Sequence, residues 1–435
     1  MSLDLFERPG HGERAILVSV DFGERDHGSL EEFRELVISA GATPVDTVTA
    51  SRSAPDARYF VGSGKARQIL ESVQASKAEV VLFNHELSAS QERNLEQLLS
   101  CRVLDRTGLI LDIFAQRARS FEGKLQVELA QLKHLSTRLV RGWTHLERQR
   151  GGIGLRGPGE TQLEMDRRLI GRRITQLEKR LEKVDRQRQQ NRSARSRADV
   201  PIVSLVGYTN AGKSTLFNRI TDAGVLAENR LFATLDPTVR RMLLPGMGDV
   251  VLADTVGFIQ NLPHDLVAAF RSTLQETRDA DLLLHVIDIH DQDFQSRVGH
   301  VNDVLEQIGA EKVPQLLVYN KIDLVDRQPA MVVDEQGATV AVAVSAATGS
   351  GVDLLRQAVT QMLSKDAVQG WIRLPPGRGR DRSLLFEHGC VLEERTDADG
   401  AFLLLIRSDR RQLERLGIPE PLEPEQTFSK VAGAA

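Results

Sequence analysis

The strongest chemical signal in the sequence is a run of small residues that leads into a lysine and a serine. The run is Gly207-Tyr208-Thr209-Asn210-Ala211-Gly212-Lys213-Ser214-Thr215, which matches the pattern G-x-x-x-x-G-K-[ST]. Glycines let backbone N–H groups converge on phosphate oxygens, Lys213 reaches the β and γ phosphates, and Ser214 binds Mg²⁺. A chance Gly-rich turn would not also supply lysine and serine in register after the apolar run at 202–206. The run therefore predicts a nucleoside triphosphate site.

A second motif, Asp254-Thr255-Val256-Gly257, follows the apolar run at 250–253. Its D-x-x-G pattern would place Asp254 in the Mg²⁺ shell and the N–H of Gly257 on the γ phosphate. The tetrapeptide alone is weak evidence, but it begins 42 residues after Gly212, at the end of a predicted strand. That context favours a switch that senses the γ phosphate.

A threonine between these motifs should bind Mg²⁺ and the γ phosphate only when the nucleoside triphosphate is bound. The nucleotide-binding segment Phe232-Ala233-Thr234-Leu235-Asp236 and the Pro237-Thr238 that follows offer two candidates. We predict Thr234, with Thr238 as the competitor and a solvated loop threonine as the plain alternative. The predicted metal ligands are then Ser214, Thr234 and Asp254, and the predicted catalytic residues are Lys213, Thr234 and Gly257.

The base of the nucleotide is predicted to be recognised by the segment Asn320-Lys321-Ile322-Asp323, which follows the apolar run at 315–319. A carboxylate that accepts from guanine N1 and N2 finds no matching donors on adenine, and an unpaired buried polar group costs about 1–3 kcal/mol. Asn320 supports the base and its loop, while the stem of Lys321 covers the base. A backbone N–H of Ser345-Ala346-Ala347 would meet guanine O6, although this segment alone is uninformative. These residues predict a site for GTP and GDP.

The elements that position these motifs fall into four predicted regions of an α/β chain: an N-terminal α/β domain at 1–122, a basic helical hairpin at 123–192, a P-loop GTPase domain with a mostly parallel sheet at 199–368, and a small α+β domain at 369–435. At 435 residues, two to four domains are expected. In the first region, the strands expected at 15–20, 45–48, 79–83 and 102–104 alternate with helices, of which the first begins with Ser29 and Glu32 at capping-box spacing. A β-hairpin is expected, with strands at 384–393 and 401–407 around the turn at 396–400, followed by a short helix at 411–416.

Two heptad-like seams predict the antiparallel hairpin. Leu125, Leu129, Leu132, Leu139, Trp143 and Leu146 form the first, and Leu163, Ile170, Ile174, Leu177, Leu181 and Val184 form the second. A polar linker is expected at 186–199. The Gly-rich turn at 148–160 contains a literal G-x-G-x-x-G, but a dinucleotide site needs a strand before it, and here a helix precedes it.

Charge is segregated along the chain, although its net charge is only −4. Residues 138–197 hold 15 Arg and 2 Lys against 7 acidic residues, a net charge of +10, which leaves −14 on the rest. The basic tip at 148–173, with Arg148, Arg150, Arg156, Arg167, Arg168, Arg172 and Arg173, suits rRNA, and an ordinary solvated helix face is the alternative. Two cysteines, Cys101 and Cys390, and scattered histidines predict neither disulfides nor a zinc site. We expect a cytoplasmic monomer without stable membrane insertion.

With these motifs in hand, the chain resembles the HflX family of ribosome-associated, translation-factor-class GTPases. The most specific mark is the string Arg-Gly-Gly-Ile-Gly-Leu-Arg-Gly-Pro-Gly-Glu-Thr-Gln-Leu-Glu at 150–164, joined by Phe-Ala-Thr-Leu-Asp-Pro-Thr at 232–238. The resemblance implies GTP hydrolysis stimulated by the large (50S) ribosomal subunit, with dissociation of stalled ribosomes, ribosome biogenesis or translation under stress as the expected role. A nucleotide-dependent signalling switch that acts on a protein partner is the alternative. The family's nucleotide and Mg²⁺ residues carry over at the matching positions above.

Two positions qualify the expected mechanism. Many GTPases place a glutamine after the D-x-x-G motif to orient water, but this chain has Phe258, so intrinsic hydrolysis should be slow. Either a monovalent cation such as K⁺, held by Asn210, or the ribosome would then complete the site. ATP binding by the N-terminal domain, credited to family members, finds no P-loop here, because Gly62-Ser63-Gly64-Lys65 lacks the first glycine and the final serine or threonine.

Overall fold

A computed structural model of the chain describes residues 12–23, 27–138, 162–196, 200–221, 231–244, 247–260, 274–363, 367–387, 390–397, 399–409, 413 and 416–418. The chain divides into two compact units, and each is built from several stretches of sequence. The first unit comprises Met1–Gln189, Glu228–Asp236 and Ile259–Thr273, and the second comprises Gln190–Ala227, Pro237–Phe258 and Leu274–Ala435. None of the helices within the described ranges is long and apolar enough to cross a membrane.

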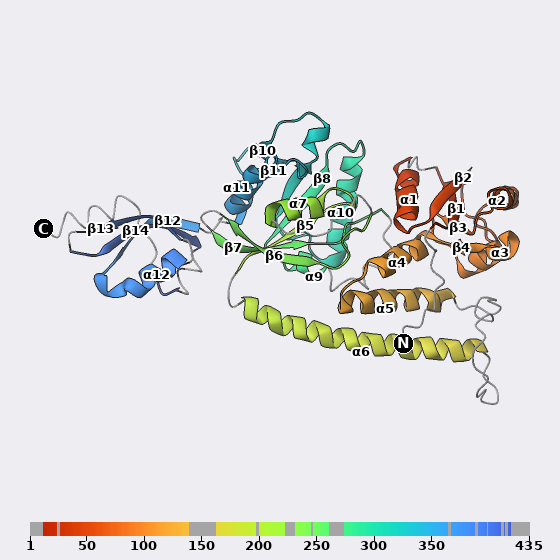
Figure 1. Ribbon diagram of the computed structural model, residues 1–435, viewed down its shortest axis with the longest axis horizontal. Helices are drawn as coiled ribbons and strands as arrows, with labels where there is room; N and C mark the ends of the chain where they lie inside the picture. Colours follow the sequence, from red (N-terminus) through yellow and green to blue (C-terminus); the bar gives the residue numbers. More distant parts are fainter. Residues whose placement is uncertain are drawn as a thin grey trace. The chain divides into compact units, whose positions relative to one another are not determined.

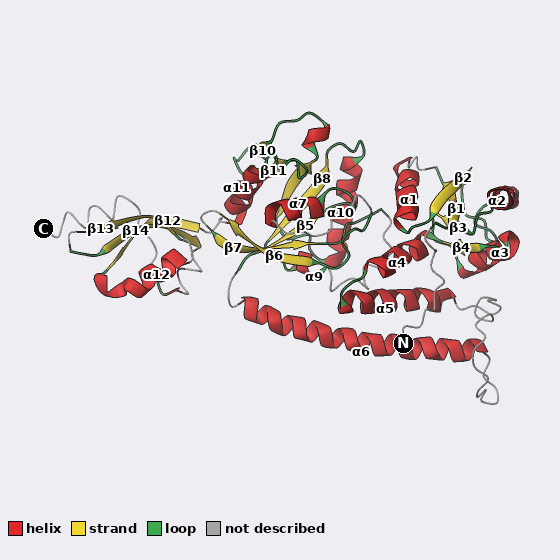
Figure 2. Ribbon diagram, viewed as in Figure 1, coloured by secondary structure: helices red, strands yellow, loops and turns green. Residues whose placement is uncertain are grey.

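The first unit begins with a four-stranded parallel sheet of order β2-β1-β3-β4, flanked by helices (Figures 1 and 2). The strands are β1 (Arg14–Asp21), β2 (Thr43–Ser51), β3 (Val80–Phe83) and β4 (Arg102–Leu104). The helices are α1 (His27–Ser39), α2 (Ser63–Ser76), α3 (Ala89–Leu99) and α4 (Arg106–Arg117). Buried β-branched and aromatic side chains of the strands form one core with the apolar faces of α2 and α3. The predicted βαβ arrangement is confirmed.

The capping box predicted at Ser29 and Glu32 is wrong, because α1 already begins at His27. Glu32 is instead buried and forms an ion pair with Arg106. A true capping box precedes α3, where the Ser88 side chain accepts from the N–H of Gln91 and the Gln91 side chain accepts from the N–H of Ser88. Tertiary pairing of Glu32 therefore outweighed its local capping pattern.

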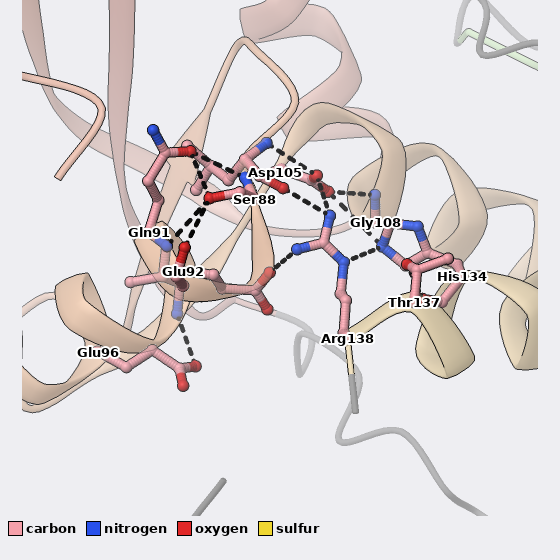
Figure 3. A network of polar contacts seen from close by, with 12 residues as sticks. Ser88, Gln91, Glu92, Glu96, Asp105, Gly108, His134, Thr137 and Arg138 are labelled. Atoms are coloured by element: carbon pink, nitrogen blue, oxygen red, sulfur yellow. Dashed lines mark hydrogen bonds and ion pairs between the residues drawn. The ribbon is translucent and has the colours of Figure 1, made fainter. Parts of the chain in front are cut away.

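A buried charged network lies at the ends of α3 and β4 (Figure 3). Arg138 donates to Glu92, to Asp105 at 2.5 Å and to the Leu87 carbonyl at 3.2 Å, while its Nε lies 2.9 Å from His134 Nε2. Two carboxyl groups thus share one guanidinium. Burial, reinforced by Asp105, raises the pKa of Glu92 to about 8 although Arg138 opposes the shift.

The predicted hairpin helices are α5 (Phe121–Arg138) and α6 (Gln162–Ser196). They pack through one apolar cluster, with Leu125, Leu129, Leu132 and Leu135 from α5 and Ile170, Ile174, Leu177 and Leu181 from α6. Ion pairs join Glu128 to Arg173 and Lys133 to Glu178. The end of the first seam and the Gly-rich turn fall within 139–161, outside the described residues.

The polar linker predicted at 186–199 is wrong over most of its length, since α6 continues to Ser196. Its Arg, Gln and Ala residues are good helix formers, and the stretch contains no Gly or Pro. Polarity alone therefore did not distinguish a linker from a solvated helix.

The second unit contains a seven-stranded sheet of order β10-β11-β9-β8-β5-β7-β6. Its strands are β5 (Ile202–Val206), β6 (Thr238–Leu244), β7 (Gly248–Asp254), β8 (Leu282–Asp288), β9 (Gln315–Asn320), β10 (Ala330–Val333) and β11 (Thr339–Ala343). Only the edge strands β10 and β6 are antiparallel to their neighbours. The helices are α7 (Lys213–Thr221), α9 (Gln275–Arg278), α10 (Phe294–Ile308), the 3-10 turn η2 (Ile322–Leu324) and α11 (Val352–Leu363). The mostly parallel sheet is confirmed, although both edge strands were not anticipated.

A three-stranded antiparallel sheet of order β12-β14-β13 completes the second unit. Its elements are β12 (Ala367–Leu374), the 3-10 turn η3 (Pro376–Arg378), α12 (Gly379–Glu387), β13 (Val391–Thr396) and β14 (Phe402–Asp409). The hairpin around 396–400 is present, but residues 384–387 are helical rather than strand. The helix expected at 411–416 lies largely outside the described residues.

Candidate nucleotide site

The loop at 207–212 joins β5 to α7 in a conformation that glycine makes possible. Gly207 and Gly212 have φ of 144° and 94°. A Cβ on Gly207 would lie 2.3 Å from the Val286 carbonyl oxygen, and one on Gly212 would lie 2.2 Å from Asn320 Nδ2. Both glycines are therefore needed because side chains would collide with the neighbouring strands. Asn210 also has a positive φ, of 61°, in this tight turn.

The side chain of Lys213 folds back over this loop. Its Nζ donates to the carbonyl oxygens of Gly207 at 3.0 Å and Tyr208 at 2.7 Å. The residue is 6% exposed, and burial lowers the pKa of the ammonium to about 8, although Asp254 acts in the opposite direction. A buried cation that contacts mainly neutral carbonyl oxygens can gain further stabilisation from an anion such as phosphate.

The two predicted metal ligands of the second unit meet. Ser214 Oγ lies 2.7 Å from Asp254 Oδ2, so a hydroxyl and a carboxylate at the start of α7 and the end of β7 offer adjacent oxygens. Oxygen ligands of this kind suit Mg²⁺, and the donor set fits that ion. Thr255 is fully buried and donates to the Leu205 carbonyl at 2.6 Å, which ties β7 to β5. The Thr255 hydroxyl thus makes a contact within the sheet.

Gly257 lies against the loop. A Cβ there would be 2.9 Å from Lys213 Nζ and from Thr209 Cα. The backbone is fixed on both sides, because Phe258 N donates to the Gly207 carbonyl at 3.1 Å and Thr209 N donates to the Phe258 carbonyl at 2.7 Å. The buried Thr209 hydroxyl has no hydrogen-bond partner among the described residues, which fits a site completed by a phosphate.

Phe258, the residue after the D-x-x-G motif, is packed into the protein. Its side chain is fully buried, and its backbone pairs with Tyr208 as an isolated parallel bridge. The residue that replaces glutamine is thus a packing residue. This geometry agrees with the expectation that the chain does not orient the attacking water from this position.

Asn320 connects the base-reading segments. Its Nδ2 donates to the Ala211 carbonyl at 2.8 Å, and its Oδ1 accepts from the N–H of Ala346 at 2.9 Å. One side chain therefore joins the phosphate loop to the segment 345–347. Sequence reasoning missed Arg219 on α7, which donates to the carbonyls of Ala346 at 3.3 Å and Ala347 at 2.5 Å. No local motif marks that contact, since the partners are more than 120 residues apart.

Lys321 and Asp323 follow β9. Lys321 has a positive φ of 64° and its Nζ lies 2.6 Å from Asp288 Oδ2, at the end of β8. Ile322 is buried, whereas Asp323 is exposed. This arrangement anchors the turn through Ile322 and Lys321 and leaves the Asp323 carboxylate at the surface, where a base can reach it.

The segment at 231–236 belongs to the first unit, unlike Ser214 and Asp254. Of the three predicted Mg²⁺ ligands, Thr234 therefore belongs to the first unit, and Ser214 and Asp254 belong to the second. Phe232 and Leu235 are buried, and Thr234 is half-buried. The carboxylate of Asp236 accepts from backbone N–H groups at the start of α5. The competing candidate, Thr238, is the first residue of β6 and lies opposite Asp254.

A strand, a Gly-rich loop and a helix that begins at the loop lysine, with an aspartate at the end of the adjacent parallel strand, define a P-loop nucleoside triphosphatase. With the Asn-Lys-Ile-Asp segment after β9, the protein is a P-loop GTPase, an enzyme that hydrolyses GTP. The family models agree. Residues 202–321 match the model described as 50S ribosome-binding GTPase, and residues 330–421 match the HflX C-terminal domain. Residues 27–115 match GTP-binding GTPase N-terminal, and residues 117–195 match its Middle Region. The chain belongs to the HflX family of GTPases.

Known relatives support this assignment along the whole chain. The chain is 58% identical to GTPase HflX of Escherichia coli, over 96% of this chain and 98% of that protein. It is 45% identical to GTPase HflX of Caldanaerobacter subterraneus subsp. tengcongensis, over 89% of each chain. A GTP-binding protein from Sulfolobus solfataricus, solved in complex with GDP, is 24% identical with a TM-score of 0.44, and covers 81% of this chain and 99% of its own. That structural likeness is too low to add to the assignment.

Proposed function

We propose that this GTPase acts on the large ribosomal subunit and uses its basic hairpin to contact rRNA. The observation that carries the proposal is the charge of α6, which holds 11 basic and 5 acidic residues. Exposed basic side chains follow the helix, namely Arg167, Arg168, Arg172, Lys179, Arg180, Lys183 and Arg186. Such a surface meets a phosphate backbone by electrostatic attraction. The 50S-binding description of the matched family model and the HflX relatives support the same partner.

The nucleotide site suggests why a partner is needed. Lys213 would hold the β and γ phosphates, Gly257 would donate to the γ phosphate, and Ser214 and Asp254, with Thr234, would hold Mg²⁺. The ion supplies charge neutralisation when bound. Because Phe258 is buried and apolar, orientation of water falls to a group outside this set. Docking on the ribosome is the proposed source of that group, with a role in dissociating stalled ribosomes or in biogenesis or translation under stress.

Sedimentation of 70S ribosomes tests the proposal directly. The full chain is mixed with ribosomes and GTP, a non-hydrolysable analogue or GDP, and the profile is read on a sucrose gradient. Splitting with GTP and the analogue but not with GDP is expected for a dissociation factor. Cosedimentation with the 50S subunit without splitting would favour biogenesis. Failure to associate in any nucleotide state would contradict the proposal.

Charge on α6 can be tested separately. Arg172→Ala together with Arg180→Ala should weaken 50S binding and reduce its dependence on salt, since each phosphate contact adds to the salt slope. Arg380→Ala together with Arg395→Ala, two exposed arginines of α12 and β13, is the charge-matched control. An equal loss with both variants would show that the effect comes from total charge and not from the hairpin.

Two alternatives remain as measurable outcomes. A signalling switch would bring down a protein partner rather than rRNA when the GTP-bound chain is used as bait. A monovalent cation held by Asn210, in the tight turn of the phosphate loop, would make turnover faster in potassium than in sodium without ribosomes. Equal rates in the two salts would exclude the cation.

A further inference from the structure

The carboxylate of Asp236 sits on the first turn of α5. Its Oδ2 accepts from the N–H groups of Arg119 at 2.8 Å and Ser120 at 2.7 Å, and its Oδ1 accepts from the Ser120 hydroxyl at 2.5 Å. The same hydroxyl accepts from the N–H of Gly123 at 2.8 Å. Helix N-termini favour negative charge, so the contact joins an anion to the positive end of α5.

Gly123 leaves the space that this contact occupies. A Cβ on Gly123 would lie 2.2 Å from Asp236 Oδ1 and 3.0 Å from Ser120 Oγ. Glycine is among the least favourable residues in a helix, and Gly123 has no positive φ to explain its presence. Its place in the first turn of α5 is therefore explained by the close approach of Asp236.

A second anchor lies two residues before Thr234. The Phe232 ring packs edge-on against Phe114 of α4 with centroids 4.7 Å apart, and Phe232 is 2% exposed with a φ of 56°. Leu231 N donates to Ser39 Oγ at 3.2 Å. Thr234 is thus the central residue of a segment fixed at Phe232 and at Asp236, both within the first unit.

We infer that Asp236 is a positioning residue for Thr234, and that Ser120 and Gly123 of α5 complete its binding site. The inference rests on the proposed role of Thr234 with Mg²⁺ and the γ phosphate. Holding both ends of a short segment reduces the conformational freedom that the segment loses when its threonine binds. Since α5 is also the first helix of the hairpin proposed to meet rRNA, one helix carries both the ribosome-binding element and the anchor of the switch.

The test uses the full chain without ribosomes. Affinities for GDP and for a non-hydrolysable GTP analogue are measured with Mg²⁺ for wild type and Asp236→Ala. The analogue should bind about tenfold more weakly to the variant, as expected for loss of charge-assisted hydrogen bonds, and the GDP affinity should not change because GDP has no γ phosphate for Thr234. Intrinsic turnover should fall by a similar factor.

Two further variants separate positioning from folding. Gly123→Ala should reproduce the loss by displacing the carboxylate, although alanine favours the helix. In a Thr234→Ala background, Asp236→Ala should cause no additional loss. Asp334→Ala is the matched control, because the Asp334 carboxylate also accepts from backbone N–H groups, those of Gln336 at 2.9 Å and Ala338 at 2.8 Å, in the turn after β10.

Three outcomes would overturn the inference: an equal loss for both nucleotides, tighter binding of the analogue, or a loss that adds to that of Thr234→Ala. The Thr234→Ala variant tests the proposed role of Thr234 independently of Asp236. If Thr234→Ala alone leaves the ratio of the two affinities unchanged, that role is wrong. If Thr234→Ala changes the ratio and Asp236→Ala does not, only the positioning role is wrong.

Discussion

Lys213 in the nucleotide site and Arg138 in the N-terminal domain are both buried cations, but their surroundings differ. Lys213 donates to two carbonyl oxygens, and burial lowers the pKa of its ammonium to about 8. Arg138 contacts two carboxylates, a carbonyl and an imidazole (Figure 3). Lys213 lacks a full set of compensating negative charges within the protein, so it can bind an incoming anion. Arg138 is enclosed by carboxyl groups, so it stabilises the fold. The difference separates a ligand site from a structural network.

Replacing Lys213 should have the largest effect. Lys213→Ala removes the ammonium from the phosphates, and GTP hydrolysis should fall by about 10³-fold, as for loss of a preorganised charge-stabilising group. The thermal stability of the nucleotide-free variant should not fall, because a desolvated charge has been removed. Phosphate release and melting temperature measure the two effects. Lys65→Ala, in the first turn of α2 in the N-terminal domain, is the control, and an equal loss of GTP hydrolysis in that variant would contradict the comparison.

Replacing Arg138 should damage the fold and spare the nucleotide site. Arg138→Met leaves Glu92 and Asp105 buried without their shared cation, at a cost of about 3–5 kcal/mol to the N-terminal domain. Hydrogen exchange should show faster opening of β3 and β4, while affinity for GDP is retained. Arg186→Met removes an exposed pair with Glu182 and should cost less than about 1 kcal/mol. Loss of GDP binding in Arg138→Met would contradict the structural role.

The carboxylates of the network should also give the N-terminal domain a pH dependence. Because the pKa of Glu92 in the folded chain is raised to about 8, the folded state binds a proton that the unfolded state has released between about pH 4.5 and pH 8. Stability against urea should therefore fall as the pH rises through this range. Glu92→Gln should flatten the slope, and Glu178→Gln, in an exposed pair, should leave it unchanged. Stability that rises over the range would refute the assignment.

The smallest effect is expected for Arg219. Arg219→Ala removes two hydrogen bonds to the segment 345–347, and loss of about 1 kcal/mol would weaken GDP binding roughly fivefold. Arg356→Ala is a matched control, because Arg356 also donates to a carbonyl, that of Ile220, at 3.1 Å. Isothermal titration with GDP compares the variants. A loss above a hundredfold would mean that Arg219 contacts the nucleotide itself.

The sequence predicted the strands, loop and helix that position the candidate nucleotide site, because these parts are local. The loop between β5 and α7 and the turn after β9 are short segments whose residue types follow from the chemistry of phosphate and guanine. The position of Thr234, and the contacts of the predicted residues with a nucleotide, stay predictions. Edge strands β6 and β10 were missed because their partly exposed residues show no long apolar run.

Ion pairs and hydrogen bonds between residues far apart in the chain could not be predicted from the sequence. Arg138 meets Glu92 and Asp105 across 46 and 33 residues, and Glu32 meets Arg106 across 74. Asp236 was grouped with the nucleotide ligands by its motif, yet its carboxylate contacts a helix 116 residues away. Periodicity reports which face of an element is buried, but not which charged residue will lie opposite.

Gly123 bears on how this enzyme can be engineered. A stabilisation campaign guided by helix propensity would choose Gly123→Ala early, since replacing a helical glycine commonly gains about 0.5–1 kcal/mol. Here the new methyl group would occupy the place of the Asp236 carboxylate, and loss of its hydrogen bonds would offset that gain. Libraries built for durability should therefore keep this glycine fixed, and screens should score turnover beside heat resistance.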